Sequence, residues 1–152
     1  MRTTPSSVGA AAFLALLLAF PPAALGDADV KTSPSNSADF NLGADAVKAK
    51  DWQQAVYHLE IVAKAEPTNA DAQNLLGYAY RNQGKYDLAF RHYGEALKID
   101  PKHRGANEYI GEAYVLTGNK AKAQEHLAAL ERICGKSCEE YQDLAKAIAK
   151  AK

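Results

Sequence analysis

The chain has 152 residues, of which 47% are hydrophobic, and its 18 basic and 18 acidic side chains give a formal net charge of zero at pH 7. Lysine and arginine are interspersed with aspartate and glutamate, whereas a protein that neutralises phosphates usually carries a basic stripe. The charge pattern therefore argues against a nucleic-acid partner.

The N-terminal segment 1–26 has the pattern of a secretory signal peptide. Arg2 precedes an apolar run, Val8–Phe20, which is followed by Pro21-Pro22 and by small residues before Asp27. The run is shorter than the roughly 18 to 20 residues of a membrane-spanning helix. The residue directly after the expected cleavage point is Asp27, so no cysteine is placed there for attachment of a lipid. We expect an exported protein in the bacterial periplasm, or a secreted one, with no stable membrane anchor and a mature net charge of −1, because cleavage removes only Arg2 among the charged residues.

The segment 27–36 is polar, contains Pro34 and lacks apolar periodicity, so we expect a flexible leader. The folded domain is predicted over 37–150. Its size is sufficient for a continuous core when three or more repeats stack.

Three copies of one repeating unit fill this domain, at about 36–69, 70–103 and 104–137. In the central copy, Leu76, Gly77 and Tyr80 lie along one helical face, and Ala89 and Tyr93 lie along another after a break at Gly84, which predicts two antiparallel amphipathic helices. A shift by one repeat length in either direction finds corresponding residues: Leu42, Gly43, Ala55, Leu59 and Pro67 before, and Ile110, Gly111, Tyr114, Ala123 and Leu127 after.

This pattern resembles the tetratricopeptide repeat family, which runs W-x2-L-G-x2-Y, then A-x3-F, then P. The resemblance implies an all-α protein: a right-handed α-solenoid of three helix-turn-helix units. Two departures stand out. Asp39, Gln73 and Asn107 replace the opening aromatic residue, and Ala46 replaces the tyrosine of the other copies.

A capping helix is predicted over 138–150. The sequence Ser137-Cys138-Glu139-Glu140 has the S-x-x-E form of a capping box. Tyr141, Leu144, Ala145 and Ile148 form one apolar stripe, as expected of a terminal helix in a solenoid. Leu144-Ala145 also falls one repeat length after Ile110-Gly111, so this helix corresponds to half of a fourth repeat.

Cys134 and Cys138 are the two cysteines of the chain, and in an exported protein an even pair favours a disulfide. A redox-active pair is the alternative, because Cys138 would lie in the first turn of a helix, where the dipole lowers a thiol pKa. Adjacent Glu139 and Glu140 oppose that effect, and the C-x3-C spacing differs from the C-x-x-C of thioredoxin-like sites.

His58, His92 and His126 recur once in every repeat, each on the second helix of its copy. Equivalent side chains on packed helices, whose axes are about 8 to 10 Å apart, are poorly placed to share one metal ion, so we expect no metal site. The sequence contains no phosphate loop, nucleophile elbow or H-E-x-x-H pair. We therefore predict a protein that is not an enzyme and uses no cofactor.

The expected functional surface is the concave face of the stacked repeats. In the family that the chain resembles, the first helix of each repeat lines this face. The corresponding residues here fall off the Leu-Gly-Tyr stripe, so we expect them to be exposed. They are Phe40, Ala44, Val47 and Lys48, then Asn74, Tyr78, Arg81 and Asn82, then Glu108, Glu112, Val115 and Leu116.

The sequence thus predicts an interaction scaffold or adaptor whose groove holds a peptide segment of another exported protein. The alternative is a thiol-disulfide redox or redox-accessory protein that uses Cys134 and Cys138. The sequence leaves self-association open.

Overall fold

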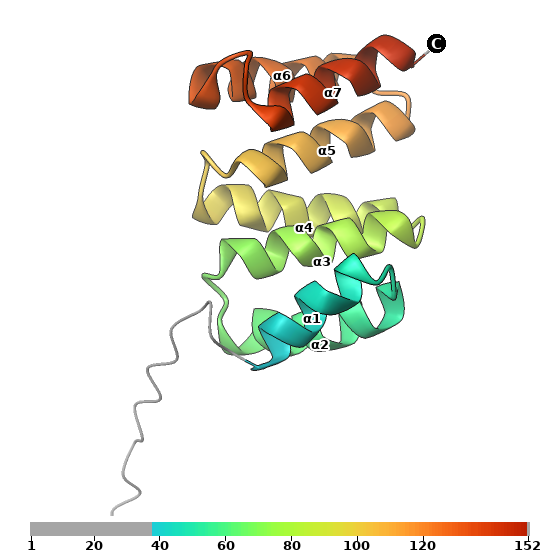
Figure 1. Cartoon of the computed structure of the whole chain (residues 1–152), viewed down its shortest axis with the longest axis vertical. Helices are drawn as coiled ribbons and strands as arrows, with labels where there is room; N and C mark the ends of the chain where they lie inside the picture. Colours follow the sequence, from blue (N-terminus) through green and yellow to red (C-terminus); the bar gives the residue numbers. More distant parts are fainter. Residues whose placement is uncertain (1–37, 152) are drawn as a thin grey trace, which may run out of the picture. The chain divides into compact units, whose positions relative to one another are not determined.

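The computed structural model describes residues 38–151, which form seven helices and no strand. The helices are α1 (Ala38–Lys48), α2 (Trp52–Ala65), α3 (Ala70–Asn82), α4 (Tyr86–Ile99), α5 (Arg104–Leu116), α6 (Lys120–Cys134) and α7 (Glu139–Lys150), drawn in Figure 1. The predicted all-α fold of three helix pairs and one further helix is confirmed. The expected signal peptide and leader lie outside the described residues, and none of the described helices has the length and apolarity needed to cross a bilayer.

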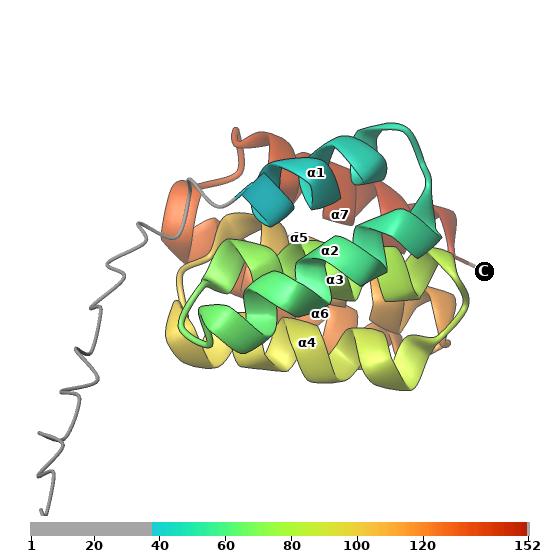
Figure 2. The same cartoon turned by 90° about the horizontal axis from the view of Figure 1, so that it is seen from below.

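Consecutive helices pack as antiparallel pairs, α1 with α2, α3 with α4 and α5 with α6, and the pairs stack in chain order (Figure 1). The odd-numbered helices also contact one another, α1 with α3, α3 with α5, and α5 with α7, whereas the described even-numbered helices α2, α4 and α6 do not. Because neighbouring units are closer on the odd-numbered side, that side is the inner, concave side of the stack. Figure 2 shows the same stack from below.

Glycines at the helix crossings set the distance within the pairs. A Cβ built on Gly43 would lie 2.7 Å from Leu59 Cγ, and one built on Gly77 would lie 2.7 Å from Tyr93 Cδ1. The third crossing differs from the expectation. A Cβ built on Gly111 would lie 2.5 Å from Leu144 Cδ2 of α7, whereas Leu127 of α6 is only half-buried. The capping helix therefore supplies the side chain that the second helix supplies in the first two units.

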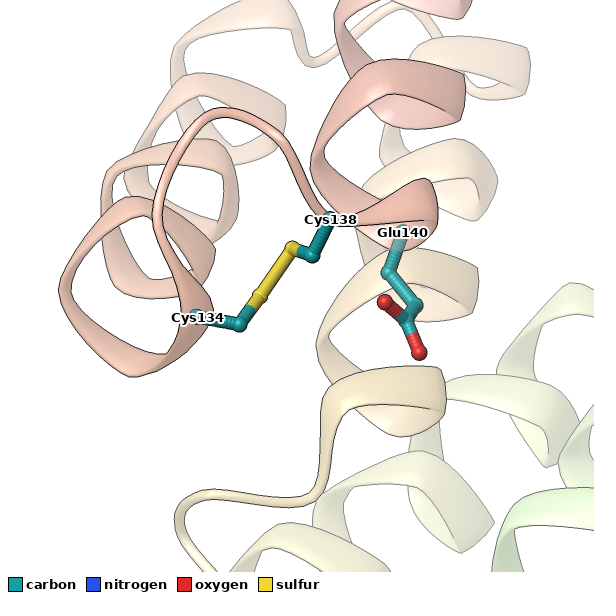
Figure 3. A group of neighbouring side chains, drawn as sticks. All are labelled: Cys134, Cys138 and Glu140. Carbon is teal, nitrogen blue, oxygen red and sulfur yellow. A yellow bond between two sulfur atoms is a disulfide. The ribbon is translucent and has the colours of Figure 1, made fainter.

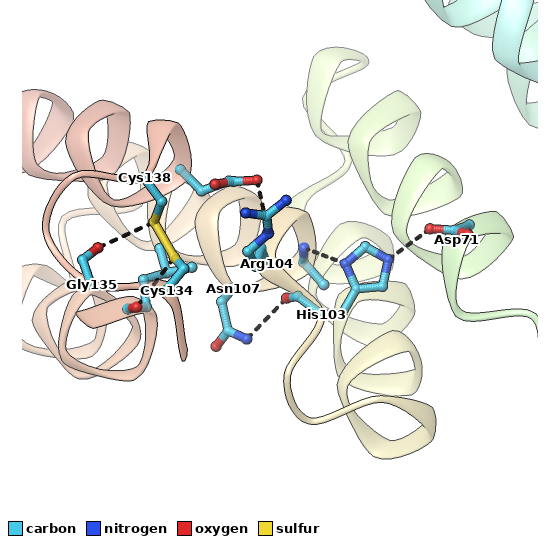
Figure 4. Close-up of polar contacts among 10 residues, drawn as sticks. Asp71, His103, Arg104, Asn107, Cys134, Gly135 and Cys138 are labelled. Atoms are coloured by element: carbon cyan, nitrogen blue, oxygen red, sulfur yellow. Dashed lines mark hydrogen bonds and ion pairs between the residues drawn. A yellow bond between two sulfur atoms is a disulfide. The ribbon is translucent and has the colours of Figure 1, made fainter. Parts of the chain in front are cut away.

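Side-chain oxygens of Asp51, Asn69 and Asn119 accept hydrogen bonds from the first turns of α2, α3 and α6. The imidazole of His103 has the same role in α5: its Nδ1 accepts from Ala106 N–H at 3.2 Å, and its Nε2 lies 3.0 Å from Asp71 Oδ1 of α3 (Figure 4). The start of α5 is thus tied to the preceding unit.

The predicted capping box at Ser137 is wrong. α7 begins at Glu139 with Cys138 as its N-cap residue, and the Cys138 side chain makes no capping hydrogen bond. Glu140 is therefore one position too early for the reciprocal bond, and its carboxylate instead pairs with Arg104 of α5 at 3.3 Å.

Candidate functional site

A cavity of about 380 Å³ lies on the concave side of the stack. Its lining comes from four helices: Arg81 and Asn82 of α3, Tyr86 of α4, Glu112, Val115 and Leu116 of α5, and Ala147 of α7. Residues far apart in the sequence meet here because the repeats stack. Leu116, with 61% of its surface exposed, is the most exposed of the large hydrophobic residues described.

Arg81 makes an ion pair, a hydrogen bond and two contacts with aromatic rings at this cavity. Its guanidinium forms an ion pair with the Glu112 carboxylate and also donates to the Tyr109 carbonyl oxygen at 3.4 Å. The guanidinium carbon lies 4.9 Å from the centre of the Tyr78 ring and 5.4 Å from that of Tyr109. Arg81 therefore joins α3 to α5 across the boundary between two repeats.

An aromatic row runs along the same boundaries. The Tyr78 ring is 5.9 Å from Trp52 of the first repeat and 4.7 Å from Tyr109 of the third, measured between ring centres. Aromatic pairs at these separations stabilise beyond their buried area. Tyr78 thus contacts the units on both sides of its own.

The expectation that the off-stripe residues of the first helices are exposed is wrong for several of them. Asn74 is 6% exposed, and the Arg81 side chain is 10% exposed. Phe40, Val47 and Tyr78 are partly buried against the core. The reason is that this face of each odd-numbered helix packs on the next odd-numbered helix, so part of it becomes an interface between repeats. Ala44, Glu108, Glu112 and Val115 are half-buried, and Lys48, Asn82 and Leu116 are exposed.

Five of the residues predicted for the groove nevertheless meet at one cavity: Arg81, Asn82, Glu112, Val115 and Leu116. Phe40, Ala44, Val47 and Lys48 of α1 do not line it, nor do Asn74, Tyr78 and Glu108. The structure therefore concentrates the candidate site on the second and third repeats.

A second cavity, of about 270 Å³, lies between α5 and α7 and is acidic. It is lined by Gly105, Glu108, Tyr109, Glu139, Glu140 and Asp143. Burial raises the pKa of Glu108 to about 8, and the nearby carboxylates of Glu112, Asp143 and Glu140 add to the effect. Glu108 is therefore largely protonated at neutral pH.

The residues that α7 brings to both cavities are absent from the sequence prediction. Glu139, Glu140, Asp143 and Ala147 belong to the segment predicted as a cap. The available signal was the match of Leu144-Ala145 to Ile110-Gly111, which places α7 as the first helix of a fourth unit. First helices face the concave side, so α7 extends the groove as well as closing the core.

A disulfide joins Cys134, the last residue of α6, to Cys138 at the start of α7 (Figure 3). Gly135 between them has φ 79°, the left-handed conformation that ends α6. The Glu140 carboxylate lies near the two sulfurs, and one donor atom from each of the three residues falls within 4.8 Å of the others. Because the sulfurs are bonded to each other, they are not thiolate ligands for a metal.

The three recurring histidines are each bonded within their own repeat. Nδ1 of His58 lies 2.8 Å from Asp39 Oδ1, Nδ1 of His92 lies 2.8 Å from Gln73 Oε1, and Nδ1 of His126 lies 3.1 Å from Asn107 Oδ1. These partners are the residues that replace the opening aromatic of the repeat pattern. Each histidine therefore forms its own hydrogen bond, which connects the two helices of one repeat.

Comparison with known proteins agrees with this architecture. Residues 70–103 match the family model described as Tetratricopeptide repeat. The chain is 32% identical over 108 residues to "DnaJ protein P58IPK homolog B" of Oryza sativa subsp. japonica, covering 66% of this chain and 22% of that protein. It is 29% identical over 96 residues to "DnaJ protein P58IPK homolog" of Arabidopsis thaliana, covering 62% of this chain and 19% of that protein. The chain thus spans about a fifth of the length of these curated relatives.

Two solved structures share the fold. The Yersinia enterocolitica type III secretion chaperone SycD, in complex with a peptide of the translocator YopD, superposes with a TM-score of 0.66 at 17% identity, covering 78% of this chain and 89% of that one. A chain of the CopN-Scc3 complex superposes with a TM-score of 0.61 at 17% identity, covering 84% and 81%. At this identity the likeness shows the fold alone.

Proposed function

We propose that this chain, which belongs to the tetratricopeptide repeat family, is a non-catalytic scaffold that holds a peptide segment of another protein in the groove formed by α3, α5 and α7. The cavity of about 380 Å³ is the observation that carries the proposal. It combines the apolar side chains of half-buried Val115 and exposed Leu116 with the polar groups of Arg81 and Glu112. A binding site typically combines an apolar lining with a few placed polar groups.

The solved structure of SycD supports this proposal, because that protein has the same fold and was solved with a peptide of YopD. A solenoid surface of this kind presents several helices to one extended segment. The bound segment would therefore contact residues of two or three repeats at once.

A matched pair of photo-cross-linking positions tests the proposal. A benzophenone amino acid replaces either Leu116 in the groove or Tyr57 on α2, whose exposed fractions are 61% and 60%. Tyr57 lies on the side of its helix opposite the buried Leu59, so it faces away from the groove. We expect a discrete cross-linked protein at position 116 and none at position 57. Equal cross-linking at both positions would contradict the groove as the binding surface.

We also propose that the protein is exported, with the periplasm as its location. The support is the signal-like pattern of residues 1–26 together with the Cys134–Cys138 disulfide, since structural disulfides persist in oxidising compartments. Cell fractionation followed by N-terminal sequencing tests this. A mature chain that begins near Asp27 in the exported fraction is expected, and an intact Met1 in the cytosolic fraction would contradict it.

One observation favours the redox alternative: Cys138 occupies the N-cap position of α7, where a helix dipole lowers a thiol pKa. The Glu140 carboxylate near the sulfurs has the opposite effect. The reduction potential of the pair separates the two functions, because a structural disulfide resists reduction by glutathione whereas a catalytic one exchanges readily.

A further inference from the structure

Glu108 has no counter-ion although it lies among carboxylates. Around the acidic cavity, Glu140 pairs with Arg104 at 3.3 Å, and Asp143 pairs with Lys146 of its own helix at 2.9 Å. Glu112 is paired with Arg81. Glu108 makes neither an ion pair nor a hydrogen bond with a described residue, and Arg81, whose charge lowers the pKa of Glu108, is itself paired with Glu112.

Two buried polar groups next to this wall also lack partners. The amide oxygen of Asn74, in a residue only 6% exposed, has no hydrogen-bond partner among residues 38–151. The Asn74 amide nitrogen faces Gly105 of the cavity lining, where a Cβ would lie 3.2 Å away. The Tyr93 hydroxyl is likewise unpartnered in a fully buried residue, and it interacts electrostatically with Arg81 and Glu112. Unsatisfied buried polar atoms are rare, and each calls for an explanation.

A cationic side chain is the ligand group that suits this wall. Lysine carries three N–H donors and arginine five, with no acceptor. Such a group entering between α5 and α7 can form an ion pair with Glu108, whose carboxyl proton is then released to solvent. It would also lie close to the Asn74 amide, which contacts Gly105 of the lining. An anionic or purely apolar side chain at this place would leave Glu108 without an ion-pair partner.

The acidic cavity and the apolar part of the groove lie along the same helix. Glu108 and Leu116 are eight positions apart on α5, which corresponds to about 12 Å at about 1.5 Å per residue. An extended peptide covers this distance in three to four residues, at about 3.3 Å each. One short segment can therefore reach both places.

We propose that the groove recognises a segment with a lysine or arginine three to four positions from a large apolar residue. The cationic group lies between Glu108 and Asp143, and the apolar group lies against Val115, Leu116 and Ala147. This proposal rests on the proposed function of the groove and specifies the chemistry of its ligand.

Two fluorescein-labelled ten-residue peptides test it by fluorescence anisotropy. The first carries one lysine and one leucine four positions apart in a serine-glycine background, and the second has glutamate in place of the lysine. With the wild-type chain after removal of residues 1–26, we expect the lysine peptide to bind at least about tenfold more tightly than the glutamate peptide. This comparison needs no variant, so it stays informative even if a substitution impairs folding.

Substitutions in the acidic cavity then test whether its carboxylates cause the preference for the lysine peptide. In Glu108→Gln with Asp143→Asn, the preference for the lysine peptide should fall to about twofold or less. The control removes two carboxylates from α6, Glu125→Gln with Glu131→Gln, which line neither cavity, and it should keep the preference. Calorimetry in two buffers at pH 7 supplies a further readout: capture of the lysine should release a proton from wild-type Glu108 but not from Glu108→Gln.

The outcomes separate the two proposals. If both peptides bind equally and Leu116→Ser weakens both, the groove binds peptides but the cationic preference is wrong. If the control variant loses the preference as fully as the groove variant does, the effect is long-range electrostatics and the site is wrong. If neither peptide binds, this inference fails together with the proposed function.

Discussion

Gly77 illustrates how one absent side chain sets the distance between two helices. It lies on α3 against the ring of Tyr93, which is fully buried. Gly94 on α4 is also helical, but a Cβ there would meet no atom within 4 Å. The two glycines thus have opposite environments within one repeat.

We therefore predict opposite effects for the same substitution. Gly77→Ala should destabilise by about 1 to 3 kcal/mol, because the added methyl group overpacks the crossing. Gly94→Ala should stabilise by up to about 1 kcal/mol, because alanine has the higher helix propensity. Urea denaturation of both variants measures the difference. A neutral Gly77→Ala would show that the crossing tolerates a wider spacing.

At the level of the helix pair, the residue that replaces the opening aromatic of the repeat pattern forms a hydrogen bond with a histidine of the second helix. His92 and His126 bond to Gln73 and Asn107, and they stack on Tyr80 and Tyr114 with interplanar angles of 14° and 18°. Burial lowers the pKa of both imidazoles below 6.5, and Arg91 adds to the effect at His92. The second and third helix pairs are thus each built around a neutral histidine.

This arrangement predicts loss of stability in acid. As the pH falls, histidines of the unfolded chain take up protons near pH 6.5, before the buried ones do. The stability contributed by the neutral imidazoles is therefore fully present above about pH 6.5 and is lost as the pH falls through the folded-state pKa. Urea denaturation between pH 7.5 and pH 5 should show a smaller loss for Gln73→Leu with His92→Leu than for the wild type. An equal loss would assign the acid sensitivity to other groups.

Across the molecule as a whole, contacts between successive repeats join the helix pairs into one stack. Arg81 and Glu112 join the second repeat to the third, and Tyr78 contacts both neighbouring repeats. The ends of the stack differ. α7 covers the last pair, whereas Leu42 of the first is 51% exposed although its counterparts Leu76 and Ile110 are at most 6% exposed.

We predict that Arg81→Met destabilises by about 3 kcal/mol, because Glu112 is left partly buried without its counter-ion. Adding Glu112→Leu should recover much of the loss, since the apolar pair leaves no unpaired charge. Denaturant titrations of the single and double variants give the coupling energy. A double variant as unstable as the single one would show that the cation–π contacts with Tyr78 and Tyr109 carry the stabilisation.

Sequence patterns alone were sufficient to predict the number, order and pairing of the helices. The glycines at the crossings and the apolar stripes recur once in every repeat, and local periodicity fixes which face of a helix is buried within its own pair. Five residues of the main cavity also followed from their positions in the repeat. The Cys134–Cys138 pairing followed from the presence of two cysteines in a chain that we expect to be exported.

The way in which one repeat meets the next became visible only in the folded arrangement. Asn74 and Arg81 have the same polar character as exposed residues in the sequence, and their burial results from the approach of α5 to α3. The acidic cavity combines α5 and α7 in the same way, because Gly111 receives Leu144 and brings Glu140 and Asp143 opposite Glu108. Contacts of this kind depend on the curvature of the stack. That curvature arises from packing between units, and no periodic sequence pattern encodes it.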